Sequence, residues 1–323
     1  MPTDETVLIT GGTGFIGSYV AATLLDRGHD VVCYDVSTDT SILDHLDITD
    51  EVTIYPGDVA DPTDVDRAIN RNDVTRIIHL AALLTPAARA DPRRAIDVNI
   101  RGATTALEAA RTFDSIERVV LASSETVYAP LSAYGTDTAR EDAIVDPQSI
   151  YAAAKLYNER QVDVYAEEYD VPAVSLRPTG VYGPYRGGDE SGVFRHVIEQ
   201  GAVGKDVTVE DGDLSVSWLY VRDAARAFVD AAMAPETDLT QRVYNIPGDV
   251  ATLREVAELV ETLVPETTMT VHDGGEEWSA QALDPTAARS DYGYEIEYDL
   301  RRGVTDYINT IRRAHDLATV NRA

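Results

Sequence analysis

The chain has 323 residues, of which 44% are hydrophobic, so it can bury a large core and form two or three domains. Its 56 acidic and 27 basic residues give a formal net charge of -29, which repels nucleic-acid phosphates and anionic lipid headgroups and argues against both kinds of partner. Arginine supplies nearly all the positive charge, and this acidic, lysine-poor composition indicates a halophilic protein adapted to strong salt, with an ordinary acidic cytosolic protein as the alternative.

The sequence favours a cytoplasmic location. It contains no apolar run long enough to span a bilayer, and its first residues have neither a charged leader nor an apolar core of the kind used for export. The single cysteine, Cys33, excludes an internal disulfide and a multi-cysteine metal site. Because Cys33 lies in the apolar run 31–34, we expect a buried strand thiol, and we expect no metal.

Short segments rich in β-branched residues alternate with longer helical patterns over the first 180 residues. The segments predicted to form strands are 7–10, 31–35, 52–55, 76–80, 119–122 and 173–176. Helical patterns cover roughly residues 14–27, 92–112 and 149–169. Asp61 and Asp91 each precede a proline, as is typical of a helix start. This alternation predicts an α/β fold with a doubly wound parallel sheet covered by helices on both faces.

The pattern changes after residue 180, where a Gly- and Pro-rich stretch over 183–188 leads into shorter helices and strands. Further helical patterns appear near 222–234, 252–263 and 299–318, without a repeat or a low-complexity linker. We therefore expect one domain over residues 1–180 and a smaller α/β lobe over residues 181–323 that closes over a substrate. This division leaves room for strands or helices of the later residues to return to the first domain.

A glycine-rich segment, residues 11–17, follows the first predicted strand and opens a helical pattern. Its glycines at positions 12, 14 and 17 match the dinucleotide fingerprint, in which the backbone approaches a pyrophosphate at a helix N-terminus. Asp35 ends the next strand at the distance where a carboxylate binds the adenosine ribose, and its charge repels a 2′-phosphate, so NAD is favoured over NADP. The alternative is a glycine-rich turn with an Asp35 that caps a strand.

Two further segments fit the same groove and make residues 1–180 the predicted NAD-binding Rossmann domain. Asp58 and Val59 follow the third strand, where they can reach an adenine ring, and small residues follow His79 at the end of the fourth. Taken singly, Asp58 is equally a turn residue, and His79 is more simply a satisfied strand-end histidine than a base. The residues predicted here to bind the cofactor are Gly11, Gly14, Phe15, Ile16, Gly17, Asp35, Asp58, Val59, Leu80, Ala81 and Ala82.

Tyr151 and Lys155 stand four residues apart in the helical pattern 149–169, so their side chains share one helix face. A free tyrosine has a pKa of about 10, too high for a base at neutral pH. A neighbouring ammonium favours the phenolate and lowers that pKa, and it can also bond a ribose. Ser124 follows the fifth strand, at the sheet edge where ligands bind, and would hydrogen-bond the reacting oxygen of a substrate. The alternative is that Ser123 and Ser124 cap a turn.

These motifs give the chain a resemblance, over nearly its whole length, to the extended short-chain dehydrogenase/reductases and among them to the NAD-dependent epimerase/dehydratase family. The matching stretches are 10–17, Asp35, 58–59, 79–82, 97–99, Ser124 with 126–128, Tyr151 with Lys155, 176–178 and 181–184. In many members the helices that correspond to 92–112 and 149–169 pair with their copies, which implies a homodimer. Arg177 either faces the substrate or is structural, and we favour the structural role.

The resemblance also implies a role for each matching residue of the site. Tyr151 moves the proton, Lys155 positions the nicotinamide ribose and tunes Tyr151, and Ser124 stabilises the substrate oxygen. Asn99 supports the site from behind. Asn99, Pro178, Tyr151 and Lys155 are accordingly added to the residues expected to bind the cofactor.

The chain departs from the nucleotide-sugar members of that family at three places. Those members usually have Asn where this chain has Gly180, Arg where it has Val216, and another Arg in a late segment that corresponds to 272–277. All three usually serve a diphosphate, and each lost charge-assisted contact removes about 1.5 to 3 kcal/mol. The 4,6-dehydratases place two acids where this chain has Glu125 and Thr126, so dehydration is not expected.

We therefore expect an NAD(P)-dependent oxidoreductase that removes a hydride from a hydroxyl-bearing carbon of a small free sugar, as an aldose 1-dehydrogenase acting for example on a pentose. The alternative is a nucleotide-sugar 4-epimerase that interconverts UDP-glucose and UDP-galactose with tightly bound NAD, in which Arg186, Arg195 or Arg222 replaces the missing arginines. A third class, a cofactor-sensing binding protein, is disfavoured by the intact catalytic residues. The sequence does not identify the sugar or the direction of the reaction.

Overall fold

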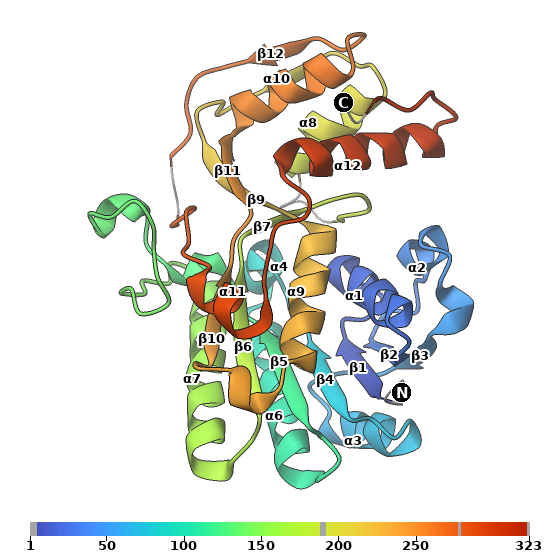
Figure 1. The fold of residues 1–323 in the computed structure, drawn as a ribbon, viewed down its shortest axis with the longest axis vertical. Helices are drawn as coiled ribbons and strands as arrows, with labels where there is room; N and C mark the ends of the chain where they lie inside the picture. The colour runs from blue at the N-terminus through green and yellow to red at the C-terminus, as the bar shows by residue number, and fades with distance from the viewer. Residues whose placement is uncertain (1–4, 188–191, 277–278, 322–323) are drawn as a thin grey trace.

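A computed structural model describes residues 5–187, 192–276 and 279–321, which form a sheet-and-helix body with a smaller lobe at one end (Figure 1). The strands of the main sheet are β1 (Thr6–Thr10), β2 (Asp30–Asp35), β3 (Thr53–Pro56), β4 (Arg76–His79), β5 (Arg118–Ala122), β6 (Ala173–Pro178) and β10 (Val243–Ile246). They are all parallel, in the order β10-β6-β5-β4-β1-β2-β3. The predicted doubly wound parallel sheet is confirmed.

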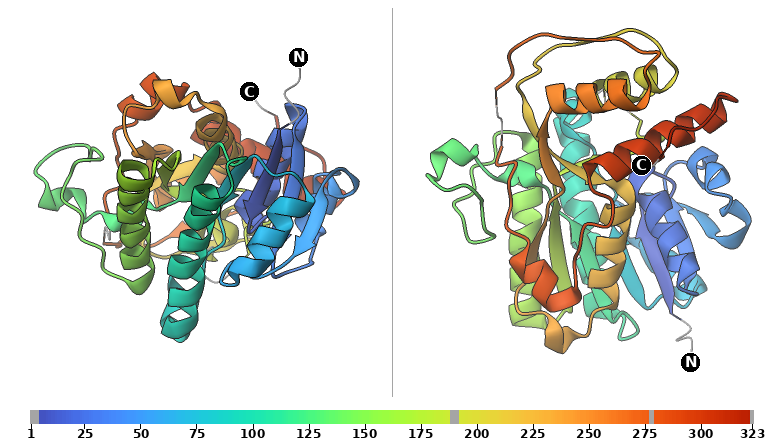
Figure 2. Two further views of the ribbon diagram at one scale, coloured as in Figure 1. Left: turned by 90° about the horizontal axis from the view of Figure 1, so that it is seen from below. Right: turned by 45° about the horizontal axis from the view of Figure 1, so that its top comes forward.

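Hydrophobic layers cover both faces of this sheet, because successive strand residues point to opposite faces. On β1, Val7 and Ile9 belong to one layer and Leu8 to the other. The helices of the first layer are α1 (Phe15–Asp26), α9 (Val221–Met233) and α11 (Thr286–Tyr292). Those of the second are α3 (Pro62–Arg71), α6 (Gly102–Thr112) and α7 (Ile150–Tyr169) (Figure 2).

Both predicted helix starts are confirmed. The Asp61 carboxylate accepts the N–H of Thr63 at 2.9 Å, and the Asp91 carboxylate accepts that of Arg94 at 3.0 Å. The helical pattern 92–112 forms three joined pieces, namely α5 (Pro92–Ala95), a π-helical turn (Ile96–Arg101) and α6. The remaining short helices of the body are α2 (Ser41–His45), α4 (Thr85–Ala90) and the 3₁₀ turns Thr49–Glu51, Glu125–Val127, Leu131–Ala133 and Glu236–Asp238.

The lobe caps the end of the sheet at which the parallel strands finish (Figure 1). Its strands are β7 (Gly180–Tyr182), β9 (Ser215–Tyr220) and β11 (Asp249–Thr252) in one small sheet, and β8 (Val207–Val209) and β12 (Met269–Val271) in another. Its helices are α8 (Gly192–Ala202), α10 (Leu253–Leu263) and α12 (Leu300–Ala314). Between these elements the chain returns to the body, where α9 packs against α1 and β10 extends the sheet beside β6.

Cys33 is fully buried in β2, as predicted from its apolar neighbours. Burial raises the pKa of its thiol to about 12, so the side chain stays a neutral part of the core. In the described ranges, none of the helices is both long enough and apolar enough to span a bilayer. Those same ranges contain no group of three or more His, Cys, Asp or Glu side chains placed to bind a metal ion.

Candidate active site

A cavity of about 990 Å³ lies where the carboxyl ends of the parallel strands meet the lobe. This edge is where open α/β sheets bind their ligands. The predicted site residues that line the cavity are Gly11, Gly14, Phe15, Ile16, Gly17, Asp35, Asp58, Val59, Leu80, Ala81, Ala82, Ser124, Tyr151, Lys155 and Pro178. Asn99 is the one predicted site residue that is not part of this lining.

The glycine-rich turn between β1 and α1 has no space for larger side chains. Gly11 has a φ of 72°, and a Cβ atom on Gly17 would lie 2.1 Å from the carbonyl oxygen of Gly11. Gly14 is the residue that precedes α1, so the first N–H groups of the helix adjoin the cavity. A closely approaching backbone with a helix N-terminus fits the pyrophosphate of a dinucleotide.

Asp35 lies beside this turn at the end of β2. Its carboxylate accepts the N–H of Thr13 at 3.3 Å and the N–H of Ser37 at 3.0 Å. These two bonds hold the carboxylate at the rim of the cavity, where its remaining lone pairs can accept hydrogen bonds from ribose hydroxyls. The same negative charge disfavours a ribose that carries a 2′-phosphate.

The segments after β3 and β4 complete the cofactor side of the cavity. Asp58 accepts the N–H of Ala60 at 2.9 Å and pairs with Arg94 at 2.6 Å, so its charge is already neutralised. His79 is buried, and its Nδ1 lies 2.8 Å from the hydroxyl of Thr10. Burial lowers the pKa of His79 to about 3, so the imidazole is neutral, which supports its interpretation as a satisfied strand-end residue.

Asn99 acts on the cavity wall from behind. Its side-chain amide donates to the carbonyl oxygen of Leu83 at 2.9 Å, and its side-chain oxygen accepts the N–H of Leu83 at 2.7 Å. Asn99 lies in the π-helical turn, and its own carbonyl oxygen accepts a 2.7 Å bond from the side chain of Asn158. The residue therefore fixes Leu83, which does line the cavity, to α7.

Tyr151 and Lys155 enter the cavity from the start of α7, which Ser149 caps by accepting the N–H of Ala152 at 3.0 Å. The Lys155 Nζ lies 5.4 Å from the centroid of the Tyr151 ring and donates to the carbonyl oxygen of Ala122 at 2.5 Å. Burial lowers the pKa of Lys155 to about 8, partly opposed by the charge of Glu159. The ammonium is therefore still mostly protonated at neutral pH, beside the phenol.

Ser124 stands at the end of β5 and begins the 3₁₀ turn Glu125–Val127. Its Oγ accepts the backbone N–H of Thr126 at 3.2 Å and the hydroxyl of Thr126 at 3.0 Å. Its own hydrogen is directed to the Glu125 carboxyl at 3.4 Å, a long hydrogen bond that a ligand can replace. Ser124 thus caps a turn and faces the cavity, so the two interpretations of this residue are compatible.

Ser123 also lines the cavity, but its hydroxyl is bonded within a buried network. Its hydroxyl donates to Glu159 at 2.5 Å, and Glu159 forms a two-point ion pair with Arg177 at 2.7 Å for both contacts. Arg177 also donates to the hydroxyl of Tyr128. Arg177 is thus held in a buried network and is not part of the cavity lining, which supports its structural role.

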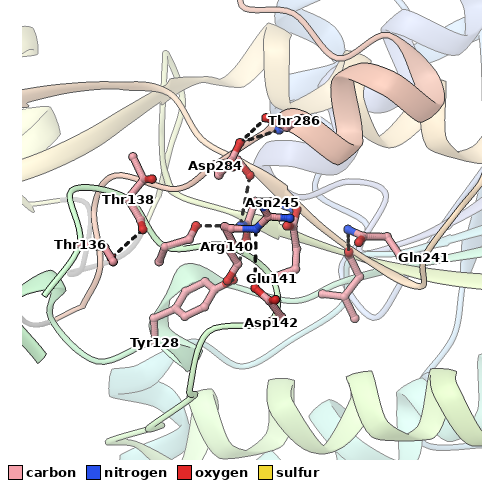
Figure 3. A network of polar contacts seen from close by, with 12 residues as sticks. Tyr128, Thr136, Thr138, Arg140, Glu141, Asp142, Gln241, Asn245, Asp284 and Thr286 are labelled. Atoms are coloured by element: carbon pink, nitrogen blue, oxygen red, sulfur yellow. Dashed lines mark hydrogen bonds and ion pairs between the residues drawn. The ribbon is translucent and has the colours of Figure 1, made fainter. Parts of the chain in front are cut away.

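The same network continues into the segment before α7, as Figure 3 shows. Tyr128 donates to the side-chain oxygen of Asn245 at 2.9 Å, and the backbone N–H of Asn245 donates to Glu141 at 2.9 Å. Asn245 also donates from its side chain to the carbonyl oxygen of Ala139 at 3.2 Å. These bonds attach the segment between β5 and α7 to β10.

The lobe contributes a mostly apolar wall to the cavity. Its lining residues include Val181, Phe194, Leu214, Val216 and Leu253. Arg186 is also part of the lining, and its guanidinium lies 4.8 Å from the centroid of the Phe194 ring. The other two arginines considered from the sequence bind elsewhere: Arg195 pairs with Glu199 at 3.2 Å, and Arg222 pairs with Asp306 at 3.5 Å.

Comparison with known proteins agrees with this geometry. Residues 7–247 match the NAD dependent epimerase/dehydratase family. The chain belongs to this family. The match covers the glycine turn, the candidate catalytic residues and the return to β10, and NAD is therefore the cofactor that the glycine turn and Asp35 would hold.

Relatives with different activities match this member of the family almost equally well. The chain is 27% identical over 319 residues to a putative UDP-glucose 4-epimerase of Methanocaldococcus jannaschii, covering 95% of this chain and 98% of that protein. It is also 27% identical over 319 residues to the mitochondrial L-threonine 3-dehydrogenase of Bos taurus, covering 94% and 82%. The solved UDP-glucose 4-epimerase of Thermus thermophilus in complex with NAD is 28% identical, with a TM-score of 0.82 and coverage of 96% and 99%.

Two features of the site were not predicted from the sequence. Glu159 had a usable signal, because it follows Lys155 by four residues and so lies on the same face of α7. In the sequence Glu125 marks only a departure from the dehydratases, whereas the structure buries it at the cavity. The sequence offers no local pattern that reports burial of a single carboxyl.

Proposed function

We propose that this enzyme uses NAD to oxidise a hydroxyl-bearing carbon of a small free sugar, in the manner of an aldose 1-dehydrogenase. The observation that carries the proposal is the composition of the cavity. Ser124, Tyr151 and Lys155 meet there, whereas the lobe wall opposite offers apolar side chains and Arg186. Val216, at the position where nucleotide-sugar members usually carry an arginine, lines the cavity with an apolar side chain. A diphosphate would therefore lose most of its expected charged contacts.

Each catalytic residue has a defined task in this proposal. The bound NAD supplies the acceptor for the hydride that leaves the substrate carbon. Tyr151, as the phenolate, takes the proton of the reacting hydroxyl. Ser124 donates a hydrogen bond to the same oxygen, and Lys155 stabilises the negative charge of the phenolate. The hydrogen bond from Lys155 to Ala122 at 2.5 Å fixes the ammonium in this position.

A second candidate, a nucleotide-sugar 4-epimerase, is favoured by a specific observation. The relatives named as UDP-glucose 4-epimerases align over almost the whole chain. In that case Arg186 would be the main positive charge for the diphosphate, because Arg195 and Arg222 are committed to Glu199 and Asp306. An enzyme of this kind would keep NAD through purification and release no NADH.

A substrate screen separates these candidates. The purified enzyme is given NAD or NADP with free pentoses and hexoses, UDP-glucose, UDP-galactose or L-threonine, at low and at molar salt. We expect steady NADH formation, read by absorbance, with a free aldose and none with UDP-sugars. Interconversion of the two UDP-sugars without net NADH would replace the proposal by the epimerase. Oxidation of L-threonine alone would contradict the proposed sugar substrate but agree with the proposed hydride transfer to NAD.

A further inference from the structure

The Glu125 carboxyl is an ionisable group of the cavity to which the mechanism above gives no task. Glu125 is 9% exposed and lines the cavity next to Ser124. Burial raises its pKa to about 7, and this effect outweighs the hydrogen bond from its own backbone N–H, the attraction of the Arg186 charge and the bond from Ser124. A folded chain gains no stability from such a group, because burial of an acid destabilises its charged form.

The neighbours of Glu125 compensate its burial only weakly. Ser124 donates a hydrogen bond of 3.4 Å to the Glu125 carboxyl. Within the described ranges, this is the side-chain hydrogen bond that Glu125 receives from another residue. Arg186, from the segment after β7, donates to the carbonyl oxygen of Val181 and packs over Phe194. A buried carboxyl with a weak internal bond, in a cavity beside a catalytic hydroxyl, is arranged for a ligand.

We propose that Glu125 binds the substrate hydroxyl adjacent to the one that reacts, and so makes the enzyme select substrates with two neighbouring hydroxyls. This inference rests on the proposed function, since it assumes that Ser124 and Tyr151 hold the reacting oxygen. The Glu125 carboxyl oxygen lies 3.4 Å from the Ser124 Oγ. Adjacent hydroxyls of a polyol lie at a comparable, hydrogen-bonding separation, so one diol can contact both groups at once.

Substrate binding by Glu125 also prepares Ser124. When the adjacent hydroxyl donates to the carboxyl, it competes with the hydrogen of Ser124 for the same acceptor oxygen. The Ser124 hydrogen is then available for the reacting oxygen, while Thr126 continues to hold the Ser124 Oγ through two bonds. Both the ionised and the neutral carboxyl retain an acceptor oxygen, so this contact does not require one protonation state.

The first test compares an aldose with its deoxy analogue that lacks the adjacent hydroxyl. The variants are Glu125→Leu, which removes every acceptor, and Glu125→Gln, which keeps one. We expect the unaltered enzyme to prefer the full sugar in kcat/KM by about 10- to 100-fold, the range for a hydrogen bond to a buried charged group. Glu125→Leu should abolish that preference, mainly by raising KM for the full sugar, and Glu125→Gln should reduce it.

A control variant and a second readout keep the test decisive. Asp230→Asn alters another carboxyl whose pKa burial raises, on α9 and outside the cavity lining, and should leave the preference unchanged. Binding of both sugars to Tyr151→Phe with NADH, with and without Glu125→Leu, is measured by calorimetry. This readout does not depend on turnover, so a failure of the proposed function is seen separately, in the screen. An unchanged preference in Glu125→Leu, or equal or absent binding of the two sugars, would overturn the inference.

Discussion

The two adjacent serines at the end of β5 contact buried ionisable groups of opposite character. Ser123 faces a network in which Glu159 and Arg177 bond each other at two points. Ser124 faces the cavity, where Lys155 and Glu125 are buried with weaker compensation. Both serines line the cavity, but the Ser123 hydroxyl belongs to a paired network, whereas the Ser124 hydroxyl bonds a carboxyl whose burial is less well offset.

The pKa directions of these buried groups express this difference. Burial acts against the charge of Arg177, yet the hydrogen bonds and charge of Glu159 hold its pKa above the ordinary value. For Lys155 and Glu125, which line the cavity near Ser124, burial prevails, so the pKa of Lys155 falls to about 8 and that of Glu125 rises to about 7. Paired buried charges hold the fold in one arrangement, whereas poorly compensated ones indicate a functional site.

The largest expected effect is on catalysis. Tyr151→Phe removes the group proposed to take the proton and should lower kcat/KM by about 10²- to 10⁴-fold, with NAD binding nearly unchanged. Steady-state kinetics and a dinucleotide titration measure the two quantities. The control is Tyr157→Phe, on the same helix and 53% exposed, which should keep full activity. A Tyr151→Phe enzyme that retains its rate would contradict the assignment.

Loss of the buried ion pair between Arg177 and Glu159 should lower the stability of the protein. Arg177→Met leaves the Glu159 carboxylate buried without its partner and should reduce the free energy of unfolding by about 3 to 5 kcal/mol, measured by urea denaturation. Arg160→Met breaks an exposed ion pair with Asp163 on the same helix and should change stability by less than about 1 kcal/mol. Equal effects of the two substitutions would contradict the structural role of the buried Arg177 ion pair.

Much of the fold was predictable because the β-branched runs and helical periods are strong. The segment predicted over 119–122 is β5 (Arg118–Ala122), and the one predicted over 31–35 is β2 (Asp30–Asp35). The strand β10 (Val243–Ile246) was missed, because four residues after a long excursion do not reveal that they pair with β6. The π-helical turn within 92–112 was missed because its apolar pattern is that of an ordinary helix.

The site was partly predictable for a similar reason. Parallel strands end at one edge, so residues that follow them, such as Gly11, Asp35 and Ser124, were expected around one cavity. The pairing of Glu159 with Arg177 joins a helix to a strand, and no local spacing encodes it. The burial of Glu125 likewise depends on how the lobe covers the sheet edge.

Lys155 gives an effect of intermediate size with a defined pH dependence. Its pKa is about 8 in the folded protein, below the ordinary lysine value of 10.5, so the unfolded chain binds more protons between these values and stability rises with pH across that window. Lys155→Met removes the free-energy cost of burying the ammonium and should stabilise the protein at pH 7 by up to about 3 kcal/mol, with loss of turnover. The gain should shrink as the pH rises from 8 toward 10.5.

The other lysine of the chain supplies the control for this experiment. Lys205 is exposed and bonds Gln200 at 2.9 Å, so Lys205→Met should change neither stability nor its pH dependence appreciably. Chemical denaturation at pH 7, 8.5 and 10 gives the required free energies. A Lys155→Met protein that is less stable at every pH would contradict this, because it would mean that protein contacts offset the cost of burying the ammonium.

The two adjacent serines test the central claim, that the Ser123 hydroxyl belongs to a network that maintains the fold and the Ser124 hydroxyl to the proposed chemistry. The measurement is the free energy of unfolding and kcat/KM of Ser123→Ala and Ser124→Ala, side by side. We expect Ser123→Ala to lose about 1.5 to 3 kcal/mol of stability, as for a hydrogen bond to a charged group, with kcat/KM nearly unchanged. Ser124→Ala should lose about 100-fold in kcat/KM with little change in stability. The reverse assignment of the two losses, or both losses in both variants, would contradict the account.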